Sequence, residues 1–246
     1  QMGKTNLLLN AKRILENGNR LFVYIDLSSL FEYERDCYRN IIDNIIEPKK
    51  NLFETIESEI YSLRDRNLPS HKEYYSSLRI ILNQFKGNLV IILDEIDALR
   101  SADYSDNIFG QIRSNYFLRT NFPEFERLTY ILSGVLEPTE LIKDRNKSPF
   151  NIGDKIYLDD FTKEEHNSFI NKSELNIEVG ISDNIYAWAN GNPRLTFDIC
   201  SEIESFLMEH EDISTKDVEE LIRKKYLMAF DVAPIDHIRE LVKSDK

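Results

Sequence analysis

The chain has 246 residues, of which 41% are apolar and 30% are charged, the balance of a soluble globular protein. Its formal charge of −12 has the wrong sign for a domain that grips nucleic acid mainly through phosphate contacts, although a local basic patch stays open. The apolar runs are too short to cross a bilayer, and two cysteines far apart in the sequence give no disulfide framework. We therefore expect a cytoplasmic protein with no membrane segment.

The first 160 residues alternate short apolar runs with amphipathic stretches. The run Leu89–Leu93 is continuously apolar, which suits a strand covered on both faces of a parallel sheet. Helical spacing is expected in the segments 5–17, 31–85 and 109–118, and strands in the segments 21–26, 89–93, 128–132 and 155–158. Buried strands alternating with helices predict a three-layer α/β P-loop NTPase core with a mostly parallel sheet.

After Phe161 the pattern becomes helical throughout. Helices are expected in the segments 163–170, 182–189, 193–209 and 215–230. We therefore predict a core at 1–160, a small all-helical lid at 161–230, and a lead-in to a further domain at 231–246.

Gly-Lys-Thr at positions 3–5 stands immediately before the first expected helix. The chain thus holds the end of a phosphate-binding loop, G-x-x-x-x-G-K-[ST], and we expect the loop's first three residues and the preceding strand to be absent from this sequence. In such a loop Gly3 admits phosphate oxygens, Lys4 lies between the β- and γ-phosphates, and Thr5 offers a hydroxyl to Mg²⁺. The alternative is a surface turn that caps a helix. A piece without the whole loop should bind nucleotide poorly.

Two adjacent carboxylates, Asp94 and Glu95, follow the buried strand at 89–93. Side chains at the carboxyl end of a parallel strand project into the crevice where ligands bind. Asp94 can hold the water shell of Mg²⁺, and Glu95 can act as general base toward an attacking water. The alternative is a solvated acidic turn, but the order of the two motifs favours a nucleotide site.

Four further residues accompany these motifs. Ser133 ends the strand at 128–132, where it either senses the γ-phosphate or simply ends a strand. Asp26 also follows a strand, and we interpret it as a turn former. Pro193 and Arg194 open a helix after Gly191, where they can contact the base and the phosphates or form an ordinary exposed corner.

Together these motifs resemble the AAA+-like and STAND-type P-loop ATPases, and more narrowly the bacterial AAA-like domain group found beside effector and repeat modules. The resemblance rests most on three segments, 134–142, 148–153 and 158–165. The Gly-Asn-Pro corner at 191–193 is similar to the G-x-P element of these proteins, and the segment 235–239 resembles the lead-in to a winged-helix domain.

The resemblance implies a switch that binds ATP or ADP with Mg²⁺ and hydrolyses ATP slowly, gating a homo-oligomer or intramolecular effector and sensor domains in a bacterial signalling or defence protein. The alternatives are a DNA-handling ATPase of the initiator or transposition-helper type, and a nucleotide-bound scaffold without turnover. Many members carry an aromatic residue where this chain has Arg194, so its sensing role stays open. Arg113 and Arg119 are candidates for an arginine finger, with no assignment between them.

Overall fold

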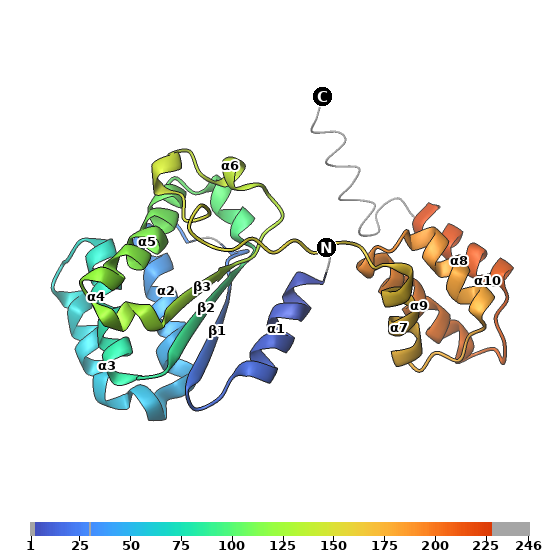
Figure 1. The fold of residues 1–246 in the computed structure, drawn as a ribbon, viewed down its shortest axis with the longest axis horizontal. Coiled ribbons are helices and arrows are strands. Elements are labelled where there is room, and N and C mark those ends of the chain that lie inside the picture. Colours follow the sequence, from blue (N-terminus) through green and yellow to red (C-terminus); the bar gives the residue numbers. More distant parts are fainter. Residues whose placement is uncertain (1–2, 30, 228–246) are drawn as a thin grey trace. The chain divides into compact units, whose positions relative to one another are not determined.

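The computed structural model describes residues 3–29 and 31–227, which divide into the two compact units drawn in Figure 1. From Thr5 onward, the division falls between Ile156 and Tyr157. The expected lead-in at 231–246 lies outside the described residues. Within the described ranges, no helix is both long and apolar enough to cross a membrane.

The first unit is built on a parallel three-stranded sheet in the order β1-β2-β3. The strands are β1 Arg20–Asp26, β2 Asn88–Asp94 and β3 Leu128–Leu132, as the apolar runs predict. The register sets Asp26 opposite Asp94, so both side chains stand at the carboxyl edge of the sheet. The predicted α/β class with a parallel sheet is confirmed.

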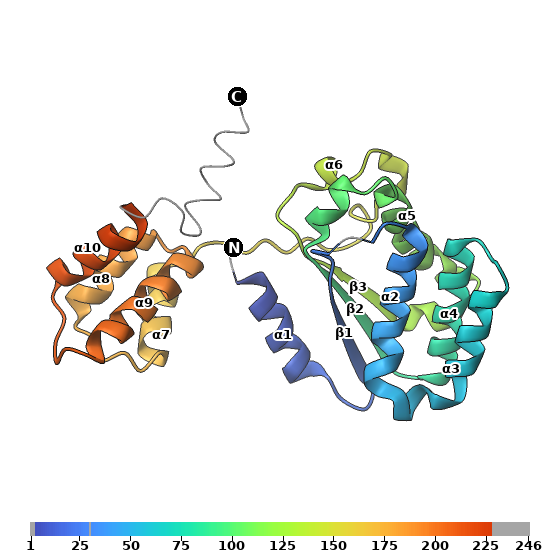
Figure 2. The ribbon, with the colours of Figure 1, turned by 180° about the vertical axis from the view of Figure 1, so that it is seen from behind.

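Helices cover both faces of this sheet, as Figure 1 and the reverse view in Figure 2 show. One face carries α1, and the other carries the larger helical layer that contains α2, α3 and α4. The helices of this unit are α1 Lys4–Leu15, α2 Glu34–Ile46, α3 Lys50–Asp65, α4 Ser70–Gln84, α5 Ser105–Phe117 and the short α6 Pro138–Leu141. Helix–sheet–helix stacking gives the three layers that the sequence predicts.

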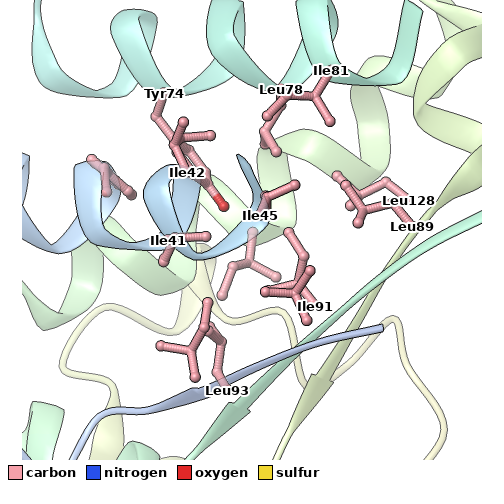
Figure 3. Packing of buried hydrophobic residues seen from close by; sticks show 14 of the residues in the cluster. Ile41, Ile42, Ile45, Tyr74, Leu78, Ile81, Leu89, Ile91, Leu93 and Leu128 are labelled. Atoms are coloured by element: carbon pink, nitrogen blue, oxygen red, sulfur yellow. The ribbon is translucent and has the colours of Figure 1, made fainter. Parts of the chain in front are cut away.

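The two faces of the sheet have separate cores because successive side chains of a strand point in opposite directions. Leu89, Ile91 and Leu93 of β2 join the main core with the isoleucines of α2 and the apolar face of α4 (Figure 3). Val90 and Ile92 point the other way and pack with Leu8 of α1. Every β2 residue after Asn88 is buried, so β2 fixes the positions of the residues that follow it.

The strand expected at 155–158 is not present. In the described chain this segment has no strand partner and no regular structure. Ile156 is 85% exposed and Tyr157 is 69% exposed, so these apolar side chains find no sheet to bury them. A run of four residues, of which three are apolar, was too short to specify a strand.

The second unit consists of helices α7 Lys163–Lys172, α8 Val179–Ala189, α9 Pro193–Leu207 and α10 Thr215–Ile222. They enclose a core of their own that includes Ile185 and Ile203. Thr162 caps α7, because its hydroxyl accepts a hydrogen bond from the Glu165 amide at 3.2 Å. After α10 the chain turns into a π-helical segment, Arg223–Leu227, and the rest of the predicted helix at 215–230 lies outside the described residues.

Candidate nucleotide site

The phosphate-loop helix and the acidic strand end meet directly in the first unit. Thr5 in the first turn of α1 donates its hydroxyl hydrogen to Oδ2 of Asp94, the last residue of β2, at 2.7 Å. These residues are 89 positions apart in the chain. Both were predicted from sequence as Mg²⁺ ligands, and the fold brings their oxygen atoms into contact.

Tyr24 is a third member of this cluster and was not predicted. Its side chain extends from β1 and donates its hydroxyl hydrogen to the same Oδ2 of Asp94, at 3.0 Å. Burial raises the pKa of Tyr24 to about 12, and the carboxylate of Asp94 adds to the shift. Tyr24 therefore stays protonated and acts as a donor over the whole physiological pH range.

Asp94 is only 1% exposed, yet it remains ionised. Burial raises its pKa, but hydrogen bonds to its oxygen atoms outweigh that effect and hold the pKa below its ordinary value. Ser133 contributes to this lowering, although its buried Oγ makes no hydrogen bond of good geometry. A buried hydroxyl without a partner beside a carboxylate leaves polar capacity for a ligand.

Glu95 has a backbone conformation that is rare for its residue type. Its φ of 54° and ψ of 39° lie in the left-handed region, which costs a side-chain-bearing residue about 1–3 kcal/mol. Its amide donates to Oδ1 of Asp94 at 3.1 Å. The turn aims two adjacent carboxylates in different directions, so that Asp94 is buried and Glu95 stays half-exposed.

Gly3 and Lys4 occupy the start of the same helix. Gly3 has a φ of 74°, a left-handed value that glycine adopts without strain. Lys4 is the first residue of α1. The start of a helix presents backbone amides and a partial positive charge, which suit phosphate oxygens.

Pro193 and Arg194 belong to the second unit, at the start of α9. Asn192 caps this helix by accepting a hydrogen bond from the Leu195 amide at 3.0 Å. Arg194 lies in the first turn, where its Nε donates to Oδ2 of Asp198 at 2.7 Å. Its guanidinium is thus held within its own helix, although 42% of the side chain is exposed.

The two candidates for an arginine finger both contact neighbouring loops. Arg113 donates to the carbonyl oxygen of Ser148 at 3.1 Å and to Oδ1 of Asn151 at 2.8 Å. Arg119 donates to the carbonyl oxygens of Phe125 at 3.2 Å and Leu128 at 2.7 Å. These contacts stabilise the loops around α5 and β3.

Residues 1–229 match the profile of a protein family described as the AAA-like domain. The chain belongs to this family. The match covers the candidate site in the first unit and the helices of the second. The predicted AAA+-like P-loop ATPase is therefore confirmed as the family of this chain.

The chain is also similar to one curated protein and to solved structures. An uncharacterised WD repeat-containing protein of Synechocystis sp. is 30% identical over 216 residues, which are 85% of this chain and 18% of that protein. The ORC1 protein of Aeropyrum pernix, solved in complex with DNA, matches 91% of this chain and 56% of its own, with 13% identity and a TM-score of 0.51.

The A. pernix ORC2 protein, solved in ADPNP-ADP complexes, matches 91% of this chain and 58% of its own, with 14% identity and a TM-score of 0.60. At these identities the likeness concerns the fold. The chain spans less than a fifth of the WD repeat-containing relative and just over half of each ORC chain.

Proposed function

We propose that this chain is an ATP-binding switch domain that hydrolyses ATP slowly and gates other parts of a larger protein. The observation that carries the proposal is the 2.7 Å hydrogen bond between Thr5 and Asp94, because it unites two motifs 89 residues apart. The match to the AAA-like domain family supports the same reading. If residues 3–5 were only a surface turn and residues 94–95 only a solvated acidic turn, nothing would require the two segments to be in contact.

The residues at this point fit Mg²⁺ and a triphosphate. A hydroxyl and a carboxylate are the hard oxygen donors that Mg²⁺ prefers, and Thr5 and Asp94 supply them side by side. The unpartnered hydroxyl of Ser133 suits a phosphate oxygen. Thr5 and Asp94 would hold the ion, and Gly3 and Lys4 would hold the phosphates. Bound Mg²⁺ would neutralise charge on the phosphate oxygens.

Hydrolysis is assigned to Glu95. Its carboxylate is half-exposed and follows the buried Asp94, so it can accept a proton from an attacking water without displacing the Asp94 carboxylate. Ser133 donates to the terminal phosphate and distinguishes ATP from ADP. Lys4 supplies positive charge where negative charge develops during transfer.

The switch requires a difference in affinity between two arrangements of the protein. Ligand at a thousand times its dissociation constant stabilises the bound form by about 4 kcal/mol, but it shifts a conformational equilibrium only if it binds one form better. We assign that difference to Ser133 in the first unit and to Arg194 in the second. Pro193 is proposed to contact the base of the nucleotide.

The larger protein is proposed to be a cytoplasmic signalling or defence protein of the STAND type. The long WD repeat-containing relative supports this, because a repeat module beside an ATPase domain can serve as a sensor. Homo-oligomerisation or an intramolecular effector domain would then be the output.

Two substitutions in the full-length protein test the proposal. We expect Lys4→Ala to abolish ATP binding, whereas Lys12→Ala, on the same helix, leaves it intact. We expect Glu95→Gln to preserve binding and to lower turnover by about 10²–10⁴-fold. Normal ATP binding by Lys4→Ala would refute the site. Wild-type turnover no higher than that of Glu95→Gln would leave a nucleotide-bound scaffold as the function.

A DNA-handling ATPase is the second candidate, favoured by the fold likeness to an ORC1 protein solved in complex with DNA. The formal charge of −12 weakens it. The two readings differ in one measurement, DNA binding by the full-length protein as a function of salt. Nucleotide-dependent binding that falls steeply with salt supports the initiator type, and its absence supports the signalling switch.

A further inference from the structure

Asp97 holds the loop that follows β3 through two hydrogen bonds. It lies in the 3-10 turn Ile96–Ser101, two residues after Glu95. Its Oδ2 accepts a hydrogen bond from the Val135 amide at 2.6 Å, and its Oδ1 accepts one from the Leu136 amide at 2.8 Å. One carboxylate therefore holds two successive amides just beyond Ser133.

The loop approaches Asp97 closely because residue 134 is glycine. A Cβ atom at Gly134 would lie 2.7 Å from Oδ1 of Asp97 and 2.8 Å from Cγ1 of Ile96. Any side chain at position 134 would therefore push the loop away from the 3-10 turn. Gly134 thus allows the amides after Ser133 to reach the carboxylate.

A backbone contact joins the same two segments. The Ile96 amide donates to the carbonyl oxygen of Ser133 at 3.1 Å, and the Ser133 amide donates to the carbonyl oxygen of Leu93 at 2.9 Å. Glu95 lies between Leu93 and Ile96, and the backbones of both residues are hydrogen-bonded to the backbone of Ser133. The left-handed conformation of Glu95 is therefore held from both sides.

We propose that Asp97 is a positioning residue that sets the placement of Glu95 relative to Ser133. The inference rests on the proposed ATPase function of this site. Asp97 acts through the backbone, because its two carboxylate oxygens accept hydrogen bonds from backbone amides. Its loss therefore impairs hydrolysis and recognition of the terminal phosphate, while general nucleotide binding persists. A displacement of about 1 Å in a catalytic group can cost on the order of 100-fold in rate.

The chain offers a matched control in Asp106. This carboxylate makes the same kind of clasp further along the loop, since it accepts the Lys143 amide at 2.9 Å and the Asp144 amide at 3.0 Å. Like Asp97, it is half-buried. Asp106 lies at the start of α5, and the two residues whose amides it accepts are outside the proposed site.

The test compares Asp97→Asn with Asp106→Asn in the full-length protein. Asparagine keeps one acceptor oxygen and sets an NH₂ group against a backbone amide, so each variant should lose a similar amount of thermal stability. We expect Asp97→Asn to lower kcat by at least about tenfold and to raise the KM for ATP several-fold, because recognition of the terminal phosphate is weakened, and we expect Asp106→Asn to leave both unchanged. Equal kcat in the two variants would overturn the proposal.

A second readout does not need turnover. We expect Asp97→Asn to reduce the ratio of the dissociation constants for ADP and ATP, because Ser133 is displaced. If the wild type shows no hydrolysis, the proposed enzymatic function fails while this ratio still decides the role of Asp97. If Asp97→Asn does not fold, Gly134→Ala moves the same loop with the carboxylate intact, and a normal kcat and a normal ratio in that variant contradict the proposal.

Discussion

Asp26 and Asp94 face each other across the parallel register of β1 and β2, but their carboxylates have different partners. Asp26 is exposed and accepts a hydrogen bond from the Ser28 amide at 2.8 Å, as a turn former does. Asp94 is buried and receives the hydroxyls of Thr5 and Tyr24. The two carboxylates stand at equivalent positions of neighbouring strands, but they differ in burial and in the groups that donate hydrogen bonds to them.

This difference makes Asp26 the control for Asp94. We expect Asp94→Asn to weaken Mg²⁺-dependent ATP binding at least about tenfold, because the amide has no charge to hold the ion's water shell. Asp26→Asn retains the acceptor oxygen of the turn and should change binding less than twofold. Calorimetric titration with and without Mg²⁺ measures both. Comparable losses in the two variants would show that the metal site is elsewhere.

Tyr24 should tune the metal requirement without contacting nucleotide. Tyr24→Phe removes one of the hydroxyls that lower the pKa of Asp94 and orient its Oδ2. We expect the Mg²⁺ concentration for half-maximal ATPase activity to rise about tenfold, at the lower end of the 10–100-fold effects known for residues behind metal ligands. The free energy of unfolding should fall by about 1 kcal/mol.

The control for this change is Tyr104→Phe. Tyr104 donates its hydroxyl to the carbonyl oxygen of Phe31 at 2.6 Å, outside the Asp94 cluster. It should lose comparable stability and keep the wild-type Mg²⁺ dependence. A Mg²⁺ dependence that is the same in both tyrosine variants would mean that Tyr24 only stabilises the fold.

The main strand and its carboxylates could be predicted because local sequence specifies them. Five apolar residues followed by two acids indicate a buried strand that ends at a site, and β2 has that form. The prediction of a strand at 155–158 was wrong, because its apolar residues have no neighbouring strand in the described chain.

Tyr24 and Asp97 could not be predicted, because their roles depend on partners distant in the sequence. Tyr24 lies 70 residues from Asp94, and Asp97 lies 38 residues from Val135. The residues next to Tyr24 and Asp97 in the sequence form no pattern that predicts these contacts. The left-handed turn at Glu95 has no local signal either, since such turns favour glycine or asparagine.

The second unit should lose stability as the pH falls, through His166. This histidine is fully buried, with Nε2 3.1 Å from the carbonyl oxygen of Ser182 and Nδ1 without a hydrogen-bond partner. Burial lowers its pKa below the ordinary value of about 6.5, so the folded unit keeps it neutral. Below about pH 6.5 the unfolded chain gains a proton that the folded unit resists, and the free energy of unfolding falls.

Trp188 reports this effect, because it is the only tryptophan of the chain and lies in α8 of the same unit. Urea unfolding followed by its fluorescence should show decreasing stability from about pH 7 to pH 5. His166→Gln should flatten that slope, whereas the exposed His210→Gln should leave it unchanged. An unaltered slope in His166→Gln would assign the pH dependence to other groups.

Arg194 should gain affinity for the terminal phosphate when its helical partner is removed. Asp198 holds its guanidinium through a hydrogen bond of 2.7 Å, and this contact must yield if Arg194 is to reach a phosphate. A partly exposed ion pair between residues four positions apart on a helix contributes at most about 1 kcal/mol, so the expected gain is less than tenfold. We therefore predict that Asp198→Asn tightens ATP binding by about two- to fivefold relative to ADP.

The double variant decides the cause. If Asp198 acts by holding Arg194, then Asp198→Asn has no effect on the preference for ATP in a protein that already carries Arg194→Ala. Binding of a fluorescent ATP analogue in competition with ATP and ADP measures the preference in all four proteins of this cycle. A gain that persists without Arg194 would show that the Asp198 carboxylate repels phosphate by itself, and Arg194 would then be an ordinary surface residue of α9.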